Sequence, residues 1–155
     1  MSGFDFSRIA PLADHIPVKL YTMHWAMIAR FYLDQIRQYN PQLAEPLLVS
    51  AIFKLLQICD KTAPTKIADV KYPSPNEPHL SSERVQHEKI ALAQTAAGDT
   101  PIAALVHGYG PVEDTISRIG VGLRASNNRI WINRYGYLSD AKLVRIGSLF
   151  KDQMR

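Results

Sequence analysis

The sequence contains a single cysteine, Cys59, among its 155 residues, and it has no apolar run long enough to cross a membrane. One cysteine excludes an internal disulfide and a cysteine-rich metal site. The first residues, Met-Ser-Gly-Phe-Asp-Phe-Ser-Arg, lack the basic and apolar regions of a signal peptide. We therefore expect a cytoplasmic protein, or one that acts inside a host cell, without a membrane partner.

Several sequence motifs that announce a cofactor or a substrate are also missing. The chain has no Walker loop, no Gly-x-Gly-x-x-Gly dinucleotide motif, no zinc spacing among its five histidines and one cysteine, and no internal repeat. We therefore predict no cofactor and no metal site, and we favour a non-enzymatic protein.

The composition is that of an ordinary globular protein, with 46% hydrophobic and 21% charged residues. A chain of this length fits one domain, residues 1–155. The most apolar stretch is Pro46–Cys59, whose polar side chains fall on one narrow stripe when it is wound as a helix. A helix that is apolar on nearly every side is buried on nearly every side. We predict an α+β fold, mainly helical, built around this buried central helix.

The remaining segments follow from local signals. Residues 18–59 predict a helical hairpin that turns at Asn40-Pro41, because the residue before proline avoids helical angles. Prolines concentrate in residues 60–80, which predicts a long loop. Residues 82–119 predict helices, including a short one from Thr100 to Val106, and Ser82 suits a helix start. Residues 120–155 predict a basic β-hairpin followed by a final helix.

The predicted hairpin has a defined register. Asn127-Asn128 suits a two-residue turn, since asparagine tolerates positive φ. With that turn, apolar side chains from 121 to 132 share one face, and the other face carries Arg124, Arg129, Trp131 and Asn133. A slip of one residue would exchange the faces, so this register is favoured.

Positive charge is concentrated at the C-terminal end. Residues 1–114 carry ten Lys/Arg and twelve Asp/Glu, whereas residues 115–155 carry eight against two. Such a basic region suits a polyanionic partner, and arginine beside exposed aromatic rings suits RNA or single-stranded DNA. The alternative is a solvated basic surface. The predicted nucleic-acid-binding residues are Arg124, Arg129, Trp131, Arg134, Tyr135, Tyr137, Lys142 and Arg145. The leading hypothesis is therefore a small nucleic-acid-binding protein, acting as an oligomer in packaging or assembly.

Two other functions remain open. Arginine, tryptophan and tyrosine also form the energetic centres of protein interfaces, so the same hairpin suits an assembly factor, adaptor or effector with an acidic protein partner. The third hypothesis is a small enzyme centred on His107-Gly-Tyr-Gly110, which is followed by Glu113 and Asp114. Glycine-rich turns of this kind supply backbone amides to anionic intermediates in some hydrolases. Caps and turns account equally well for the two glycines.

Overall fold

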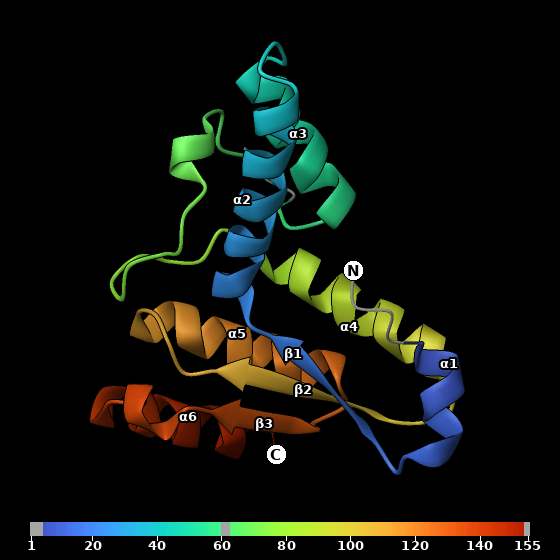
Figure 1. Cartoon of the computed structure of the whole chain (residues 1–155). Coiled ribbons are helices and arrows are strands. Elements are labelled where there is room, and N and C mark those ends of the chain that lie inside the picture. The colour runs from blue at the N-terminus through green and yellow to red at the C-terminus, as the bar shows by residue number, and fades with distance from the viewer. Residues whose placement is uncertain (1–4, 60–62, 154–155) are drawn as a thin grey trace.

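The computed structural model describes residues 5–59 and 63–153, and it combines a mainly helical chain with a small parallel sheet (Figure 1). The mixed, mainly helical character that the sequence predicts is found. Within the described residues there are six α-helices and three β-strands. In chain order these are α1 (Phe6–Ile9), β1 (Ile16–Leu20), α2 (Thr22–Tyr39), α3 (Glu45–Leu56), α4 (Glu83–Ala97), β2 (Ile102–His107), α5 (Val112–Ala125), β3 (Ile130–Asn133) and α6 (Asp140–Gln153).

The strand β2 lies at the centre of the sheet, in the order β1-β2-β3, with both pairings parallel. The prediction of a short helix through residues 100–106 is therefore wrong. The apolar run Ile102–Val106 is buried except at Leu105, which is half-buried. Short apolar runs are ambiguous between a strand and a buried helix, and pairing on both sides decides here for the strand.

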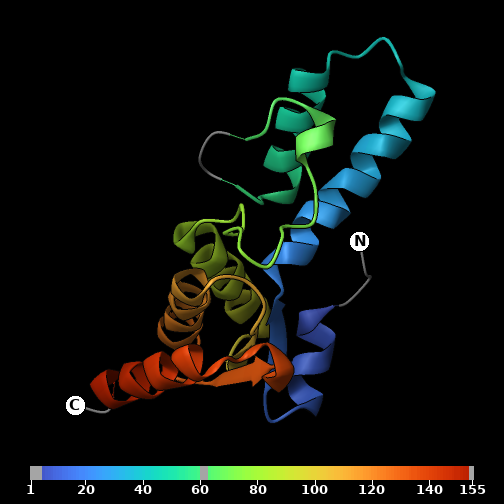
Figure 2. The same cartoon turned by 90° about the vertical axis from the view of Figure 1, so that its left-hand side faces the viewer.

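The helices α4, α5 and α6 cover one face of the sheet (Figures 1 and 2).

The predicted β-hairpin over residues 120–134 is wrong in its first arm, because residues 121–125 complete α5. Gly122 explains the difference, since a Cβ at this position would lie 3.0 to 3.2 Å from side chains of Ile130, Val106 and Ala104. The glycine lets the helix approach the sheet closely, and the second arm alone is a strand.

The helices α2 and α3 form an antiparallel hairpin that projects away from the sheet (Figure 2). The hairpin has its own apolar core with the segment 63–70, and that core includes Leu33, Ile52 and Phe53. Its first residues as predicted, 18–20, belong instead to β1. The prediction of a buried central helix is also wrong, because Leu47 and Leu55 of α3 are 68% and 67% exposed. An apolar sequence alone does not bury a helix that has a neighbour on one side only.

The proline-rich segment connects this hairpin to α4. Within it, Ile67–Asp69 forms a single 3-10 turn, whereas residues 60–62 of the predicted loop lie outside the described part of the chain. Among the helices that the structure describes, none combines the length and apolar character needed to span a bilayer. The final helix of the prediction corresponds to α6, and residues 154–155 are outside the described range.

Candidate nucleic-acid interface

The second face of the sheet is left open by the helices (Figure 1). Side chains alternate between the two faces of a strand. On β1, Ile16 and Leu20 are buried in the core under the helices, whereas Pro17 and Lys19 are exposed. On β3, Ile130 and Ile132 pack against the same core, and the indole of Trp131 is 58% exposed. Parallel sheets are usually covered on both faces, so this open face is a candidate binding surface.

The strand register brings the outward side chains into rows. Lys19, Leu105 and Trp131 stand opposite one another across the three strands. In the next row, the ring of Tyr21 packs edge-on against His107, with 5.0 Å between ring centroids, and its hydroxyl accepts a hydrogen bond from the Asn133 amide. The Lys19 ammonium lies 5.7 Å from the Tyr21 ring centre. The face therefore combines cations and aromatic rings over all three strands.

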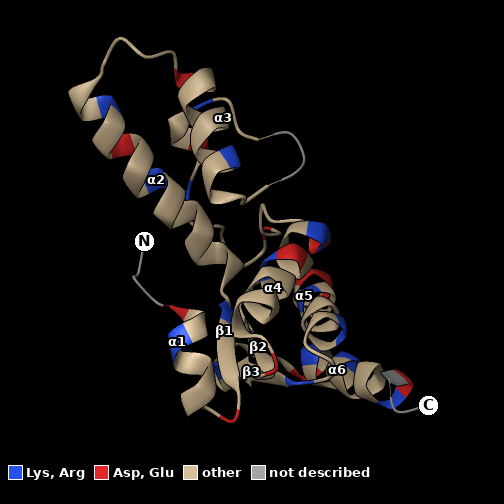
Figure 3. Cartoon of the chain, turned by 90° about the vertical axis from the view of Figure 1, so that its right-hand side faces the viewer, with Lys and Arg blue, Asp and Glu red and all other residues tan. Residues whose placement is uncertain are grey.

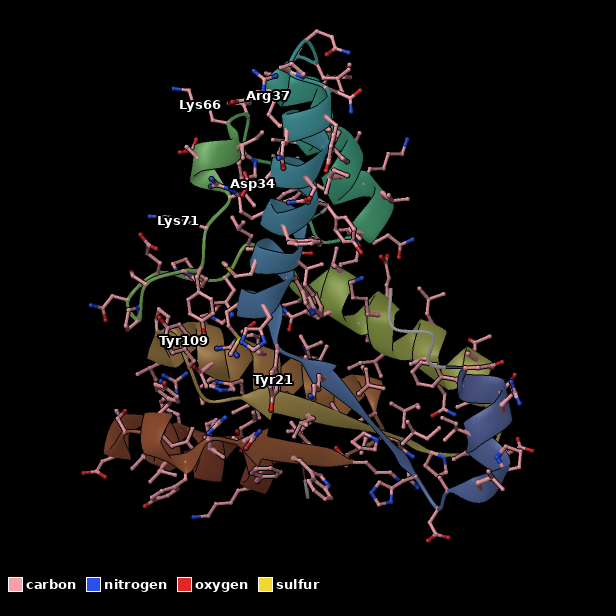
Figure 4. The ribbon with its side chains drawn as sticks, viewed as in Figure 1. Tyr21, Asp34, Arg37, Lys66, Lys71 and Tyr109 are labelled. Atoms are coloured by element: carbon pink, nitrogen blue, oxygen red, sulfur yellow. The ribbon has the colours of Figure 1, made fainter. Side chains whose placement is uncertain are left out.

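More rings gather where the strands end, and Figure 4 shows Tyr21 and Tyr109 at this edge. His107 lies 5.4 Å from Tyr137 and 6.4 Å from Tyr109 between ring centroids. Tyr137 is 50% exposed, whereas Tyr109 is buried and its hydroxyl donates to the carbonyl of Pro73. In open parallel sheets, ligands bind outside the carboxyl ends of the strands. The exposed rings at this edge thus extend the surface that Trp131 begins.

Two buried cations hold the loop 107–110 under this surface. The Arg118 guanidinium donates to the carbonyl oxygens of His107, at 2.7 Å, and of Tyr109. The Lys142 ammonium donates to the carbonyls of Gly108 and Tyr137, at 2.8 and 2.9 Å. These bonds orient three successive loop carbonyls toward cations, and they join the loop to the 3-10 turn Tyr135–Tyr137.

The loop histidine is buried and electrically neutral. Burial, with the positive charge of Arg118 and other neighbours, lowers the pKa of His107 to about 4. Its Nδ1 accepts the backbone N–H of Tyr109 at 3.1 Å. A side chain only 6% exposed offers little surface to a substrate, so the geometry suits a supporting role for His107 better than general acid–base chemistry.

The basic residues of the predicted site divide into three groups. Arg124 forms a salt bridge with Glu83 and Arg145 with Glu113, with nitrogen–oxygen distances of 3.1 and 2.6 Å. Figure 3 shows acidic and basic positions interspersed over the helices α4, α5 and α6 that carry these residues. Lys142 is buried, as described above. Arg129 and Arg134 flank β3, are exposed, and pair with no carboxylate in the described ranges 5–59 and 63–153.

The aromatic residues of the predicted site lie on β3 and in the turn directly after it. Trp131 stands on the open face, and Tyr135 and Tyr137 follow in the next turn with exposures of 75% and 50%. Sequence reasoning missed Lys19 and Tyr21, which the fold places on the same face of the sheet as Trp131. The alternation of apolar and polar residues from Ile16 to Tyr21 was the available signal for an outward-facing strand.

No group of three or more His, Cys, Asp or Glu suited to a metal occurs among the residues that the structure describes. Comparisons of the chain with protein-family models, with curated proteins and with solved structures found no match. The functional assignment therefore rests on the geometry of the surface itself.

Proposed function

We propose that the chain binds single-stranded nucleic acid, RNA or single-stranded DNA, on the open face of its sheet, without catalysing a reaction. The observation that carries the proposal is the exposed Trp131 on β3, which lies in the same row of the sheet as Lys19. Arg129 precedes this strand and Arg134 follows it. Aromatic faces stack on unpaired bases, and cations beside them contact phosphates. Sheet surfaces with exposed rings bind RNA in this way.

The arrangement favours a single strand over a duplex. Rings at Tyr21, Trp131 and Tyr137 have exposed or half-buried faces. The bases of a duplex are stacked on each other and offer no face to such rings, whereas a single strand can present its bases one by one. Readout of a duplex in the major groove usually places a helix there, and the open face consists of strands.

Removing Lys19, Arg129 and Arg134, which pair with no carboxylate among the described residues, is expected to abolish most of the salt-dependent binding. The variant is Lys19→Gln/Arg129→Gln/Arg134→Asn, with asparagine chosen because residue 134 has a φ of 67°. Each phosphate contact to a single strand contributes about −0.7 to the slope of log K against log salt, so the slope should become shallower by about 2. Fluorescence anisotropy with labelled single-stranded RNA and DNA at several salt concentrations measures it.

The matched control removes three arginines that are already bonded to glutamates, in Arg84→Gln/Arg124→Gln/Arg145→Gln. Both triple variants lose three positive charges, so a general effect of net charge would weaken them equally. The proposal requires the variant of the open face to be the weaker binder. Equal losses in the two variants would contradict it.

Truncating Trp131 tests stacking separately from charge. We expect Trp131→Ala to weaken single-stranded binding by about 1–3 kcal/mol, because one base loses its aromatic partner. The salt slope should stay unchanged, since no phosphate contact is removed. Anisotropy titrations at two salt concentrations measure both quantities, and a circular-dichroism melt checks the fold. An unchanged affinity would remove Trp131 from the interface.

The alternative function is a protein interface on the same face, with an acidic partner that meets Lys19, Arg129 and Arg134 around the Trp131 indole. Such an interface depends less steeply on salt than counterion release from nucleic acid does. Absence of oligonucleotide binding even at low salt would reject the nucleic-acid proposal and favour this alternative.

A further inference from the structure

A cavity of about 450 Å³ opens at the amino-terminal edge of the sheet, next to Trp131. Its walls include the ring of His15, whose centroid lies 6.1 Å from that of Trp131, with the two planes inclined at 47°. Ala103 and Ile130 supply apolar lining. Ligand pockets in proteins occupy about 300–1,000 Å³ and combine apolar walls with a few polar groups. The volume admits one planar heterocycle, and each ring offers an aromatic face on which it can stack.

The polar groups of this cavity are of two opposite kinds. Asp14 supplies a carboxylate, which only accepts hydrogen bonds, and Arg129 supplies a guanidinium, which only donates them. Neither pairs with an oppositely charged side chain anywhere in the described part of the chain, and in particular they do not pair with each other. Both groups are therefore available to a ligand.

We infer that this cavity binds a guanine base of the single strand. Guanine presents two adjacent donors, N1–H and N2–H, which match the two oxygens of a carboxylate. It also presents two adjacent acceptors, O6 and N7, which match an arginine fork. Adenine, cytosine and uracil lack a pair of adjacent donors for Asp14. The inference rests on the proposed nucleic-acid function and adds a base preference to it.

The test compares four labelled RNA oligomers that are identical except for one central base, which is G, A, C or U, within a uridine tract. The wild-type chain should bind the guanine oligomer about tenfold more tightly than the other three, the size of discrimination expected from a bidentate contact. Asp14→Asn should reduce that preference to about twofold or less, because an amide has a single acceptor oxygen.

Asp69→Asn is the matched control. Asp69 is exposed on the 3-10 turn of the proline-rich segment that packs against the projecting hairpin, so its change removes one negative charge, as Asp14→Asn does, but away from the cavity. The guanine preference should persist in this variant. Equal binding of all four oligomers by the wild-type chain would overturn the inference and leave the proposed function intact, and so would a preference that survives in Asp14→Asn. Absence of binding to every oligomer would overturn both.

Discussion

Replacing Arg118 by methionine is expected to lower the free energy of unfolding by about 3–5 kcal/mol, the range seen when one partner of a buried ion pair is removed. The side chain of Arg118 is fully buried. Its Nε donates to the Asp114 carboxylate at 3.0 Å, and its terminal nitrogens donate to Thr115 and to two carbonyls of the loop 107–110.

The expected loss of stability is large because the hydrogen-bond acceptors of Arg118 remain in the folded variant without their donor. Methionine fills much of the volume but donates no hydrogen bond, so two carbonyl oxygens and Oδ2 of the largely buried Asp114 carboxylate lose the bonds that Arg118 donates to them. A buried polar group without a partner costs about 1–3 kcal/mol, and more when it is charged. The loop under Tyr21 and Tyr137 would lose its support, so nucleic-acid binding should weaken as well.

Urea unfolding followed by circular dichroism measures the loss, with Arg124→Met as the matched control on the same helix. Arg124 is half exposed and bonded to Glu83, and exposed pairs of this kind contribute about 0–1 kcal/mol. A loss below about 1 kcal/mol for Arg118→Met, comparable to that of the control, would contradict the role assigned to the buried guanidinium.

Mild acid is expected to destabilise the fold through two buried histidines. Burial is the main cause that lowers the pKa of both His79 and His107 to about 4, and the charge of Arg118 adds to it. The Nδ1 of His79 lies 2.6 Å from the Thr22 hydroxyl, and its buried Nε2 has no hydrogen-bond partner among the described residues. Protonation would place a positive charge beside Arg118.

The direction of the pH effect follows from the histidine pKa values in the folded and the unfolded chain. Unfolded histidine has a pKa of about 6.5, so the unfolded chain takes up protons first as the pH falls. Stability is therefore fully present above about pH 6.5 and is lost progressively toward pH 4. At pH 5 the expected loss is about 2 kcal/mol for each histidine.

Urea midpoints between pH 7.5 and 5 test this expectation, because most carboxylates titrate below that range. His79→Gln and His107→Gln should each flatten the pH dependence by about half, whatever their effect on stability at neutral pH. His87→Gln, at an exposed position of α4, should leave it unchanged. A dependence that survives in the double variant His79→Gln/His107→Gln would show that other groups cause it.

The sequence predicted the start of α4 at Ser82, because the signal for a helix start is local: the Ser82 side chain accepts a hydrogen bond from the backbone N–H of Val85. The alternation in the last strand was also readable: Ile130 and Ile132 pack inward, and Trp131 faces outward. These features depend on the nearest neighbours along the chain, which the sequence contains in full.

The sheet could not be predicted in the same way. Ile16 pairs with Ile102, a partner 86 positions away, and no local pattern encodes that distance. The run 102–106 is apolar enough for a helix or a strand, and residues 121–125 alternate like a strand although they form the end of α5. In both segments, packing against distant elements outweighs the local preference.

The sequence by itself determined a mainly helical mixed fold, a basic C-terminal part, and an outward-facing Trp131 flanked by arginines. The tertiary structure alone decided which cations can contact a ligand. Arg124 and Arg145 form salt bridges with Glu83 and Glu113, and Lys142 is buried. It also brought His15 against Trp131, and it placed Lys19 and Tyr21 on the same face of the sheet. Proximity across parallel strands depends on the register of the whole sheet, which is a property of the folded chain.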